Sequence, residues 1–245
     1  MFLKNERIRL DKFLSSQLNI SRSDAKRLLK RNAVTINGVC EKSGDVSITA
    51  TEDIVCVNGK QIVYNKFIYI MLNKPKGIVS ASSDNKDTTV IDILPEELKR
   101  SGLFPAGRLD KDTTGFVLIT DDGEFAHNIL SPSHHVPKTY LVEVAHPLDD
   151  CQLMRFRDGM LIGEELFKPA QLRPLNKLDN NNFLYEITII EGRYHQIKRM
   201  FASAGAPVLE LKRISIGGLP LDPSLAEGAS RLITREELLS IINTV

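Results

Sequence analysis

A charged segment bounded by glycines, Gly107–Gly115, runs directly into the apolar run Phe116–Ile119. The apolar run predicts a buried strand, so two acidic and two basic side chains must lie in a loop at a strand end. Loops at strand ends often hold catalytic groups, and glycines allow a ligand to approach the backbone closely. A simple polar turn has a similar composition. The carboxylate of Asp110 is therefore a candidate nucleophile, base or RNA contact.

Beyond residue 66, strand-like and helix-like stretches follow one another at irregular spacing. The expected strands are 67–72, 116–120, 139–144, 183–190, 208–211 and 214–216. The expected helices are 92–100, a short one that follows 121–124 and runs through 130, then 148–159, 194–204 and 234–242. A regular repeat of strand and crossover helix is missing. The pattern favours an α+β fold, with a mixed, mainly antiparallel sheet flanked by helices, over a doubly wound parallel sheet.

Residues 1–60 have a different composition, with eleven Lys or Arg against seven Asp or Glu. Apolar residues at helical spacing predict a helix around 10–18, and a second helix is expected to start at Ser21. Two alternating stretches, 34–38 and 54–59, each end in Asn-Gly, a favoured tight-turn pair. We therefore expect a small helix-then-strand module over 1–62, a linker near 60–65 and a larger domain over 66–245.

The second predicted helix carries a basic face. Its cations are Arg22, Lys26, Arg27, Lys30 and Arg31. A solvated surface is the commonest fate of charge on a helix. Five cations on one short helix without matching acids instead favour contact with phosphates, and we take these residues as candidate RNA contacts.

The string Arg-Leu-Asp-Lys occurs at residues 9–12 as well as at 108–111. The first copy opens an amphipathic helix and lacks both the flanking glycines and the Thr-Thr pair of the second. We interpret Asp11 as an acid at a helix start, where the helix dipole favours negative charge.

Composition narrows the possible functions. The chain has 245 residues, 42% of them apolar, which suffices for a real core, and no apolar run approaches the ~18 residues of a membrane helix. No signal-peptide pattern, Cys-x-x-Cys pair or phosphate-loop motif is present. We expect a cytoplasmic protein without metal, cofactor or membrane contact. The net charge of +1 hides local basic patches, so it does not exclude a nucleic-acid partner.

Four motifs in order carry a family resemblance. They are Leu72–Gly77, Ala106–Gly115, Lys138–Val142 and Glu191–Met200. Together they resemble the motifs of the RsuA-type ribosomal RNA pseudouridine synthases, and residues 1–60 resemble the S4 RNA-binding domain. The resemblance covers most of the chain and implies an S4 domain followed by a catalytic domain.

The resemblance implies roles for single residues. Asp110 matches the catalytic aspartate, Tyr140 the tyrosine that stacks on the base, and Lys198 the basic partner of the aspartate. Arg108 is placed to contact the flipped nucleotide, and Arg193 is a further candidate RNA contact. Arg199, in the same motif as Lys198, is another. Taken singly, Tyr140 reads as a half-buried strand residue and Lys198 as a solvated helix lysine. Lys198 also stands where related synthases often have arginine.

The implied activity is the isomerisation of a uridine to pseudouridine in ribosomal RNA, which needs no cofactor in principle. Glu191–Gln196 and Ser131–His135 look more like the small-subunit branch, which implies a uridine of 16S rRNA, as in the uridine-516 synthase. Two alternatives stay open: a 23S rRNA synthase, and a non-catalytic RNA-binding protein associated with the ribosome. We expect the protein to act as a monomer on ribosomal RNA.

Overall fold

The computed structural model describes residues 7–131 and 134–242, so Pro132 and Ser133 of the segment Ser131–His135 lie outside the described residues. Backbone contacts divide the chain into two compact units. One contains residues up to Phe67 together with Lys99–Gly102, and the other contains Ile68–Leu98 and the chain from Leu103 onward. The return of Lys99–Gly102 to the first unit was not predicted. Each unit has its own core.

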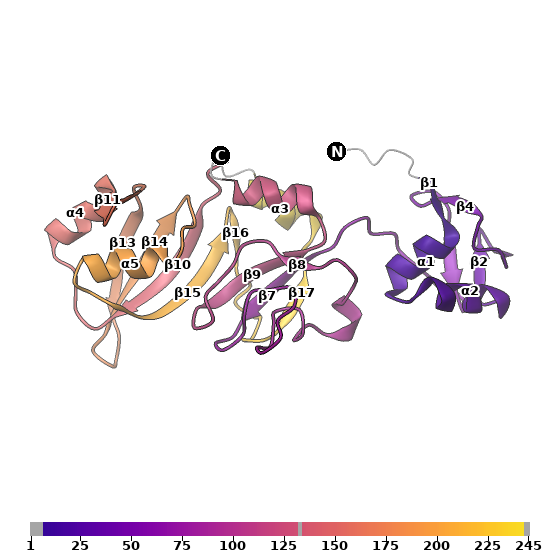
Figure 1. Cartoon of the computed structure of the whole chain (residues 1–245), viewed down its shortest axis with the longest axis horizontal. Coiled ribbons are helices and arrows are strands. Elements are labelled where there is room, and N and C mark those ends of the chain that lie inside the picture. Colours follow the sequence, from indigo (N-terminus) through magenta and orange to yellow (C-terminus); the bar gives the residue numbers. More distant parts are fainter. Residues whose placement is uncertain (1–6, 132–133, 243–245) are drawn as a thin grey trace. The chain divides into compact units, whose positions relative to one another are not determined.

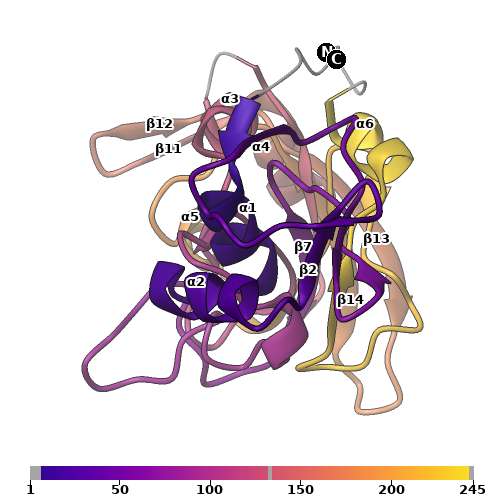
Figure 2. The same ribbon diagram turned by 90° about the vertical axis from the view of Figure 1, so that its right-hand side faces the viewer.

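In the N-terminal unit both helices precede all strands but one, as predicted, while the short strand β1 before them was not predicted (Figure 1). Its elements are β1 (Arg7–Arg9), α1 (Leu10–Leu18), α2 (Arg22–Lys30), β2 (Val34–Ile36), β3 (Val39–Cys40), β4 (Ser47–Thr49), β5 (Val55–Val57) and β6 (Lys60–Gln61). Figure 2 shows α1 and α2 beside β2. Leu10, Phe13 and Leu14 of α1 pack with Ala25 and Leu29 of α2 in one apolar cluster, so the helical spacing of these residues builds the core.

Local sequence signals of this unit act as expected. The Oγ of Ser21 accepts a hydrogen bond from the backbone N–H of Asp24, which caps α2 at the predicted start. Each of the two Asn-Gly pairs joins antiparallel neighbours, β2 to β3 and β5 to β6. Both residues of each pair have positive φ, as a two-residue hairpin turn requires.

The larger unit is built on a mixed sheet whose strands run in the order β13-β14-β10-β15-β9-β7-β17. The strands of this sheet are β7 (Tyr69–Lys74), β8 (Phe104–Pro105), β9 (Thr114–Thr120), β10 (Lys138–Val144), β13 (Gln171–Lys177), β14 (Phe183–Ile189), β15 (Val208–Ile216), β16 (Leu219–Pro220) and β17 (Ser230–Leu232). Within the described residues, β9 and β15 form the one parallel pair between these strands. The α+β fold with a mainly antiparallel sheet is confirmed.

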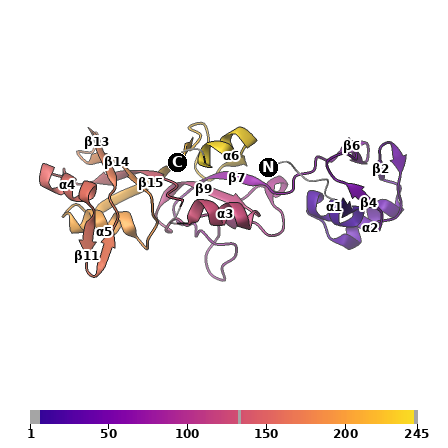
Figure 3. The ribbon, with the colours of Figure 1, turned by 90° about the horizontal axis from the view of Figure 1, so that it is seen from above.

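Strand β9 is buried along its whole length because its two faces pack into two different apolar clusters. Phe116 and Leu118 point into a cluster with α3 (Gly123–Leu130) and α6 (Arg235–Ile242), which both lie over β7 and β9 (Figure 3). Val117 and Ile119 point into the opposite cluster, which also holds residues of α4 (Asp150–Asp158) and α5 (Gln196–Ser203). A strand between two cores reads as a continuous apolar run.

Three predicted elements differ from the structure. The helix expected over 92–100 is a single 3-10 turn, η1 (Glu96–Leu98), because Pro95 interrupts backbone bonding and the chain then joins the other unit. The strands expected at 208–211 and 214–216 form one strand, β15. A further hairpin, β11 (Met160–Ile162) with β12 (Glu165–Phe167), was not predicted. In the part of the chain that the structure covers, no helix is long and apolar enough to cross a membrane.

Candidate active site

The loop that holds Asp110 enters β9 at Thr114, as the sequence predicts. Gly115 has a φ of +98°, and a Cβ built on it would lie 2.2 Å from the backbone oxygen of Arg213 on β15. Only a residue without a side chain allows the parallel pairing of β9 and β15 at this point. The glycine therefore fixes where the loop leaves the sheet.

The side chains of the loop alternate around Leu109, which is buried while its neighbours Arg108 and Asp110 face outward. The backbone of Leu109 is held on both sides by Ser80, whose hydroxyl donates to the carbonyl oxygen at 3.0 Å and accepts from the N–H at 3.1 Å. A further backbone bond joins the N–H of Thr113 to the carbonyl oxygen of Asp110 at 3.1 Å. The loop is thus a fixed support for the carboxylate.

A buried lysine lies beneath the same loop. Lys74, at the end of β7, has no exposed surface. Its Nζ donates to the backbone oxygens of Thr113 at 2.8 Å, Pro75 at 3.1 Å and Lys111 at 3.3 Å. Burial lowers the pKa of Lys74 to about 8, against the opposing effect of the loop carboxylates. The motif Leu72–Gly77 therefore supports the loop from below.

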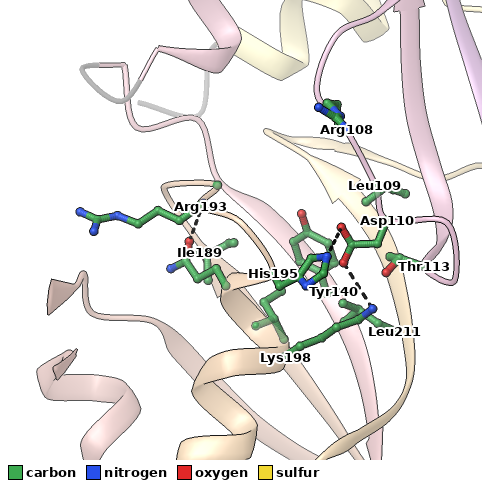
Figure 4. A pocket seen from close by; sticks show the side chains of 13 residues that line it. Arg108, Leu109, Asp110, Thr113, Tyr140, Ile189, Arg193, His195, Lys198 and Leu211 are labelled. Atoms are coloured by element: carbon green, nitrogen blue, oxygen red, sulfur yellow. Dashed lines mark hydrogen bonds and ion pairs between the residues drawn. The ribbon is translucent and has the colours of Figure 1, made fainter. Parts of the chain in front are cut away.

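Three titratable side chains, those of Asp110, His195 and Lys198, meet in one pocket, as Figure 4 shows. The Oδ2 of Asp110 lies 3.3 Å from the Nζ of Lys198, and its Oδ1 lies 3.4 Å from the Nε2 of His195. The Nζ of Lys198 lies closer still to Asp112, at 2.6 and 2.8 Å from its two carboxylate oxygens. Lys198 therefore bridges two carboxylates, and Asp112 is the nearer partner.

Lys198 is held in its charged form. Burial lowers its pKa, but the hydrogen bond from Lys198 to Asp112 and the charges of both carboxylates outweigh this effect, so the pKa lies above its ordinary value. The same hydrogen bond lowers the pKa of Asp112. The pocket therefore contains a fixed cation beside Asp110 at neutral pH. The Asp110 side chain is 31% exposed, so a ligand in the pocket can contact it.

The remaining predicted substrate contacts lie at different depths. Tyr140, on β10, is buried with its ring lining the pocket near Ile189 and Leu211. Arg108 also lines the pocket but is exposed, and in Figure 4 its side chain lies apart from the Asp110 carboxylate. One wall of the pocket is thus aromatic and aliphatic, while its mouth carries a cation.

The two predicted arginine contacts of the Glu191–Met200 motif pack on one ring. The guanidinium carbons of Arg193 and Arg199 lie 5.5 and 4.8 Å from the centre of the Phe167 ring. Arg193 lines the pocket, and its Nε lies 3.4 Å from Glu191. Arg199 does not line the pocket and is paired with Glu165 of β12. Arg199 is therefore partly neutralised within the protein.

The five predicted cations of α2 and its C-terminal end are all exposed. Arg27 forms an ion pair with Asp24, so the expectation of a face without matching acids is wrong at this position. The pairing follows from their i, i+3 spacing on the helix. The other four cations form no ion pair with the residues that the structure describes.

Sequence reasoning did not single out His195 or Asp112. His195 has a left-handed backbone conformation, with φ 49° and ψ 32°, and it is the residue that precedes α5. The helix therefore begins at Gln196 and not at the predicted Tyr194. Such a conformation is uncommon for a residue other than glycine and clusters at functional sites. Asp112 follows Asp110 by two residues on the loop, and that spacing is a signal that could have found it.

The residues present do not suggest a metal centre. Among residues 7–131 and 134–242, no group of three or more His, Cys, Asp or Glu side chains is placed to hold a metal ion. What the pocket offers is a partly exposed carboxylate, a neighbouring cation and an aromatic wall. Such a set can bind a planar base and direct a nucleophile at it or at its sugar.

Comparison with protein families identifies the class that this fold and site define. Residues 8–55 match the S4 domain, and residues 68–203, more than half of the chain, match the RNA pseudouridylate synthases. The chain belongs to the RNA pseudouridylate synthase family and is a pseudouridine synthase with an S4 domain.

Similar proteins match along almost the whole length. The chain is 45% identical over 238 residues to ribosomal small subunit pseudouridine synthase A of Yersinia pestis, which covers 96% of this chain and 98% of that protein. It is 42% identical over 232 residues to an uncharacterised RNA pseudouridine synthase of Bacillus subtilis, covering 94% and 97%. A crystal structure of a pseudouridylate synthase aligns with a TM-score of 0.64 at 40% identity, covering 96% of this chain and all of that one.

Proposed function

We propose that the protein converts one uridine of small-subunit ribosomal RNA, the counterpart of uridine 516, into pseudouridine, with Asp110 as the nucleophile. The observation that carries the proposal is the Asp110 carboxylate, partly exposed in a pocket beside a charged lysine and a tyrosine ring. The high identity to proteins named ribosomal small subunit pseudouridine synthase A supports the choice of RNA.

The reaction breaks the bond between the ribose C1′ and the base N1 and forms one between C1′ and C5. The proton on C5 leaves and N1 takes up a proton, so no atom is lost and no electron acceptor is needed. Asp110 attacks C1′ of the sugar or C6 of the base, and both routes require an ionised carboxylate within reach of the nucleotide. The Nζ of Lys198, 3.3 Å from this carboxylate, orients it toward the nucleotide.

The target base must leave its stack before the carboxylate can reach it. Tyr140 receives the flipped uracil against its ring, with Ile189 and Leu211 close by in the same pocket. Arg108, exposed at the pocket mouth, contacts the flipped nucleotide or its phosphate. Arg193 contacts the RNA at the other side of the pocket, and Arg199 becomes available if Glu165 moves away.

The N-terminal module, residues 1–62, supplies part of the RNA affinity while residues 66–245 perform the reaction. The match of residues 8–55 to the S4 domain and the exposed cations of α2 support this division. Arg22, Lys26, Lys30 and Arg31 are the main phosphate contacts, and Arg27 contributes less because of Asp24. The pocket is built from one chain, so we propose a monomer that works where ribosomal RNA is made and assembled, in the cytoplasm.

The test is to map pseudouridines in ribosomal RNA from cells that lack the protein and from the same cells carrying either the unaltered chain or Asp110→Asn. We expect one pseudouridine of 16S rRNA to disappear, to return with the unaltered chain, and to stay absent with Asp110→Asn. A missing pseudouridine in 23S rRNA would overturn the choice of subunit. Unchanged modification in both RNAs would overturn the proposed reaction.

A further inference from the structure

One aromatic side chain beside the active site has no role in the account so far. Tyr194 has 77% of its surface exposed, more than any other large apolar or aromatic side chain in the described part of the chain. Its ring stacks on the imidazole of His195, with ring centres 3.8 Å apart and planes inclined by 18°. His195 in turn lies 3.4 Å from Asp110. The stack therefore leads outward from the carboxylate, with the outer face of Tyr194 open.

The turn that presents Tyr194 is rigidly held. The buried side chain of Gln196 donates to the carboxylate of Glu191 at 2.7 Å and accepts from the N–H of Arg193 at 3.1 Å. Glu191, also buried, accepts from the backbone N–H of Lys168 at 2.9 Å. These bonds span both ends of the turn, and the left-handed backbone of His195 sets the direction of its ring. Tyr194 is therefore an exposed ring on a fixed support.

The surroundings of the ring select the kind of ligand. Arg193, the preceding residue, is exposed and lines the pocket, and Arg108 stands at the same pocket mouth. An open aromatic face beside a pocket that carries cations matches the surfaces that hold single-stranded nucleic acids, in which bases stack on rings while cations contact the phosphates. A base stacked on Tyr194 would extend the stack that begins at His195.

We propose that Tyr194 is a stacking platform for the nucleobase next to the target uridine in the RNA chain. This inference rests on the proposed function, since it assumes that the pocket takes one flipped uridine. When that uridine leaves the helix, its neighbour loses a stacking partner, and the Tyr194 ring replaces it. Tyr194 thereby favours RNA in which the target is already flipped.

The experiment uses the full-length protein and single-stranded RNAs of about six nucleotides with one uridine. In matched RNAs the nucleotide on the 5′ or the 3′ side of the uridine is abasic. Dissociation constants are measured for the unaltered protein, Tyr194→Ala and Tyr194→Phe. We expect Tyr194→Ala to weaken binding of the intact RNA by about tenfold, and Tyr194→Phe to bind it almost as well as the unaltered protein.

The abasic RNAs separate stacking from other effects. On the RNA that lacks the stacked base, we expect Tyr194→Ala and the unaltered protein to bind equally, and we expect the same equality with uridine monophosphate. Equal losses on intact and abasic RNAs, or no loss on either, would overturn the inference. Turnover of 16S rRNA by the unaltered protein tests the proposed function separately. If the enzyme is active but Tyr194→Ala shows no loss of affinity specific to the intact RNA, only the stacking role of Tyr194 is rejected.

Discussion

The two copies of Arg-Leu-Asp-Lys have the same sequence and different surroundings. In the N-terminal copy, Asp11 lies in the first turn of α1 with only 1% of its side chain exposed. Arg9 of the same string donates to both of its oxygens, at 3.1 and 2.8 Å, and this hydrogen bonding lowers the pKa of Asp11. In the second copy, Asp110 is 31% exposed, and its cationic partner Lys198 comes from a distant helix.

The difference lies in the backbone on which each string is placed. At a helix start, the arginine and aspartate turn toward each other and close a local pair, which leaves no room for a ligand. On the extended loop, Arg108 and Asp110 lie on either side of buried Leu109, and each is free for a separate contact. A carboxylate satisfied by its own neighbours stabilises a fold, whereas one held by distant groups can face a substrate.

Placing the loop depends first on Gly115, for which the N-terminal copy has no equivalent. Gly115→Ala would press a Cβ into the backbone of Arg213, so we expect at least about 4 kcal/mol of lost stability and little folded protein. Gly77→Ala is the matched control, because it has a φ of +82° and nothing within 4 Å of the added Cβ. It should cost about 1 kcal/mol in chemical denaturation. Equal costs would show that the close approach of β15 is unimportant.

The long-range pairing of Asp110 can be broken at Lys198. We expect Lys198→Met to slow pseudouridine formation on bound RNA by about a hundredfold with nearly unchanged affinity, because the carboxylate loses its fixed cation. Arg199→Met, one residue further along α5 and outside the pocket, is the control and should leave the rate on bound RNA unchanged. Single-turnover rates and dissociation constants separate the two effects. Lost affinity at an unchanged rate would make Lys198 a phosphate contact instead.

The N-terminal unit should act on affinity alone. Replacing Arg22, Lys26 and Lys30 by glutamine removes three exposed cations, and we expect the slope of log affinity against log salt to fall by about two units, with at least tenfold weaker binding. The rate at saturating RNA should not change. Arg27→Gln is the control with a smaller effect, since Arg27 is already paired with Asp24. RNA titrations at several salt concentrations measure both the affinity and its salt slope. Equal slopes for the unaltered protein and all variants would show that the cations of α2 are solvated and do not contact phosphates.

Local signals in the sequence predicted local structure well. Ser21 marked the start of α2, and the two Asn-Gly pairs marked hairpin turns, because each depends only on neighbouring residues. The single strand β15 was read as two because Lys212 and Arg213 interrupt its apolar pattern. Arg213 is nevertheless buried, with its Nε donating to the carbonyl oxygen of Phe116 at 2.7 Å. That bond depends on the tertiary structure, which periodicity does not contain.

The candidate site was predictable only in part, because sequence motifs identify residues but do not show which of them meet in the folded chain. Motif resemblance pointed to Asp110 and Lys198, and the structure places them 3.3 Å apart, although their roles stay predictions. The stronger bond of Lys198 to Asp112 and the approach of His195 depend on how the loop and α5 meet. No spacing in the sequence fixes such a meeting, since the two segments are far apart along the chain.

The most direct test of the account compares the two aspartates in one assay. Asp110→Asn and Asp11→Asn are examined by single-turnover conversion of saturating 16S rRNA and by thermal unfolding. We expect Asp110→Asn to lose at least about a thousandfold in rate with an unchanged fold, and Asp11→Asn to keep its rate while losing about 1 to 3 kcal/mol of stability. Near-normal turnover by Asp110→Asn, or a comparable loss of rate in Asp11→Asn, would contradict the assignment of the reaction to Asp110.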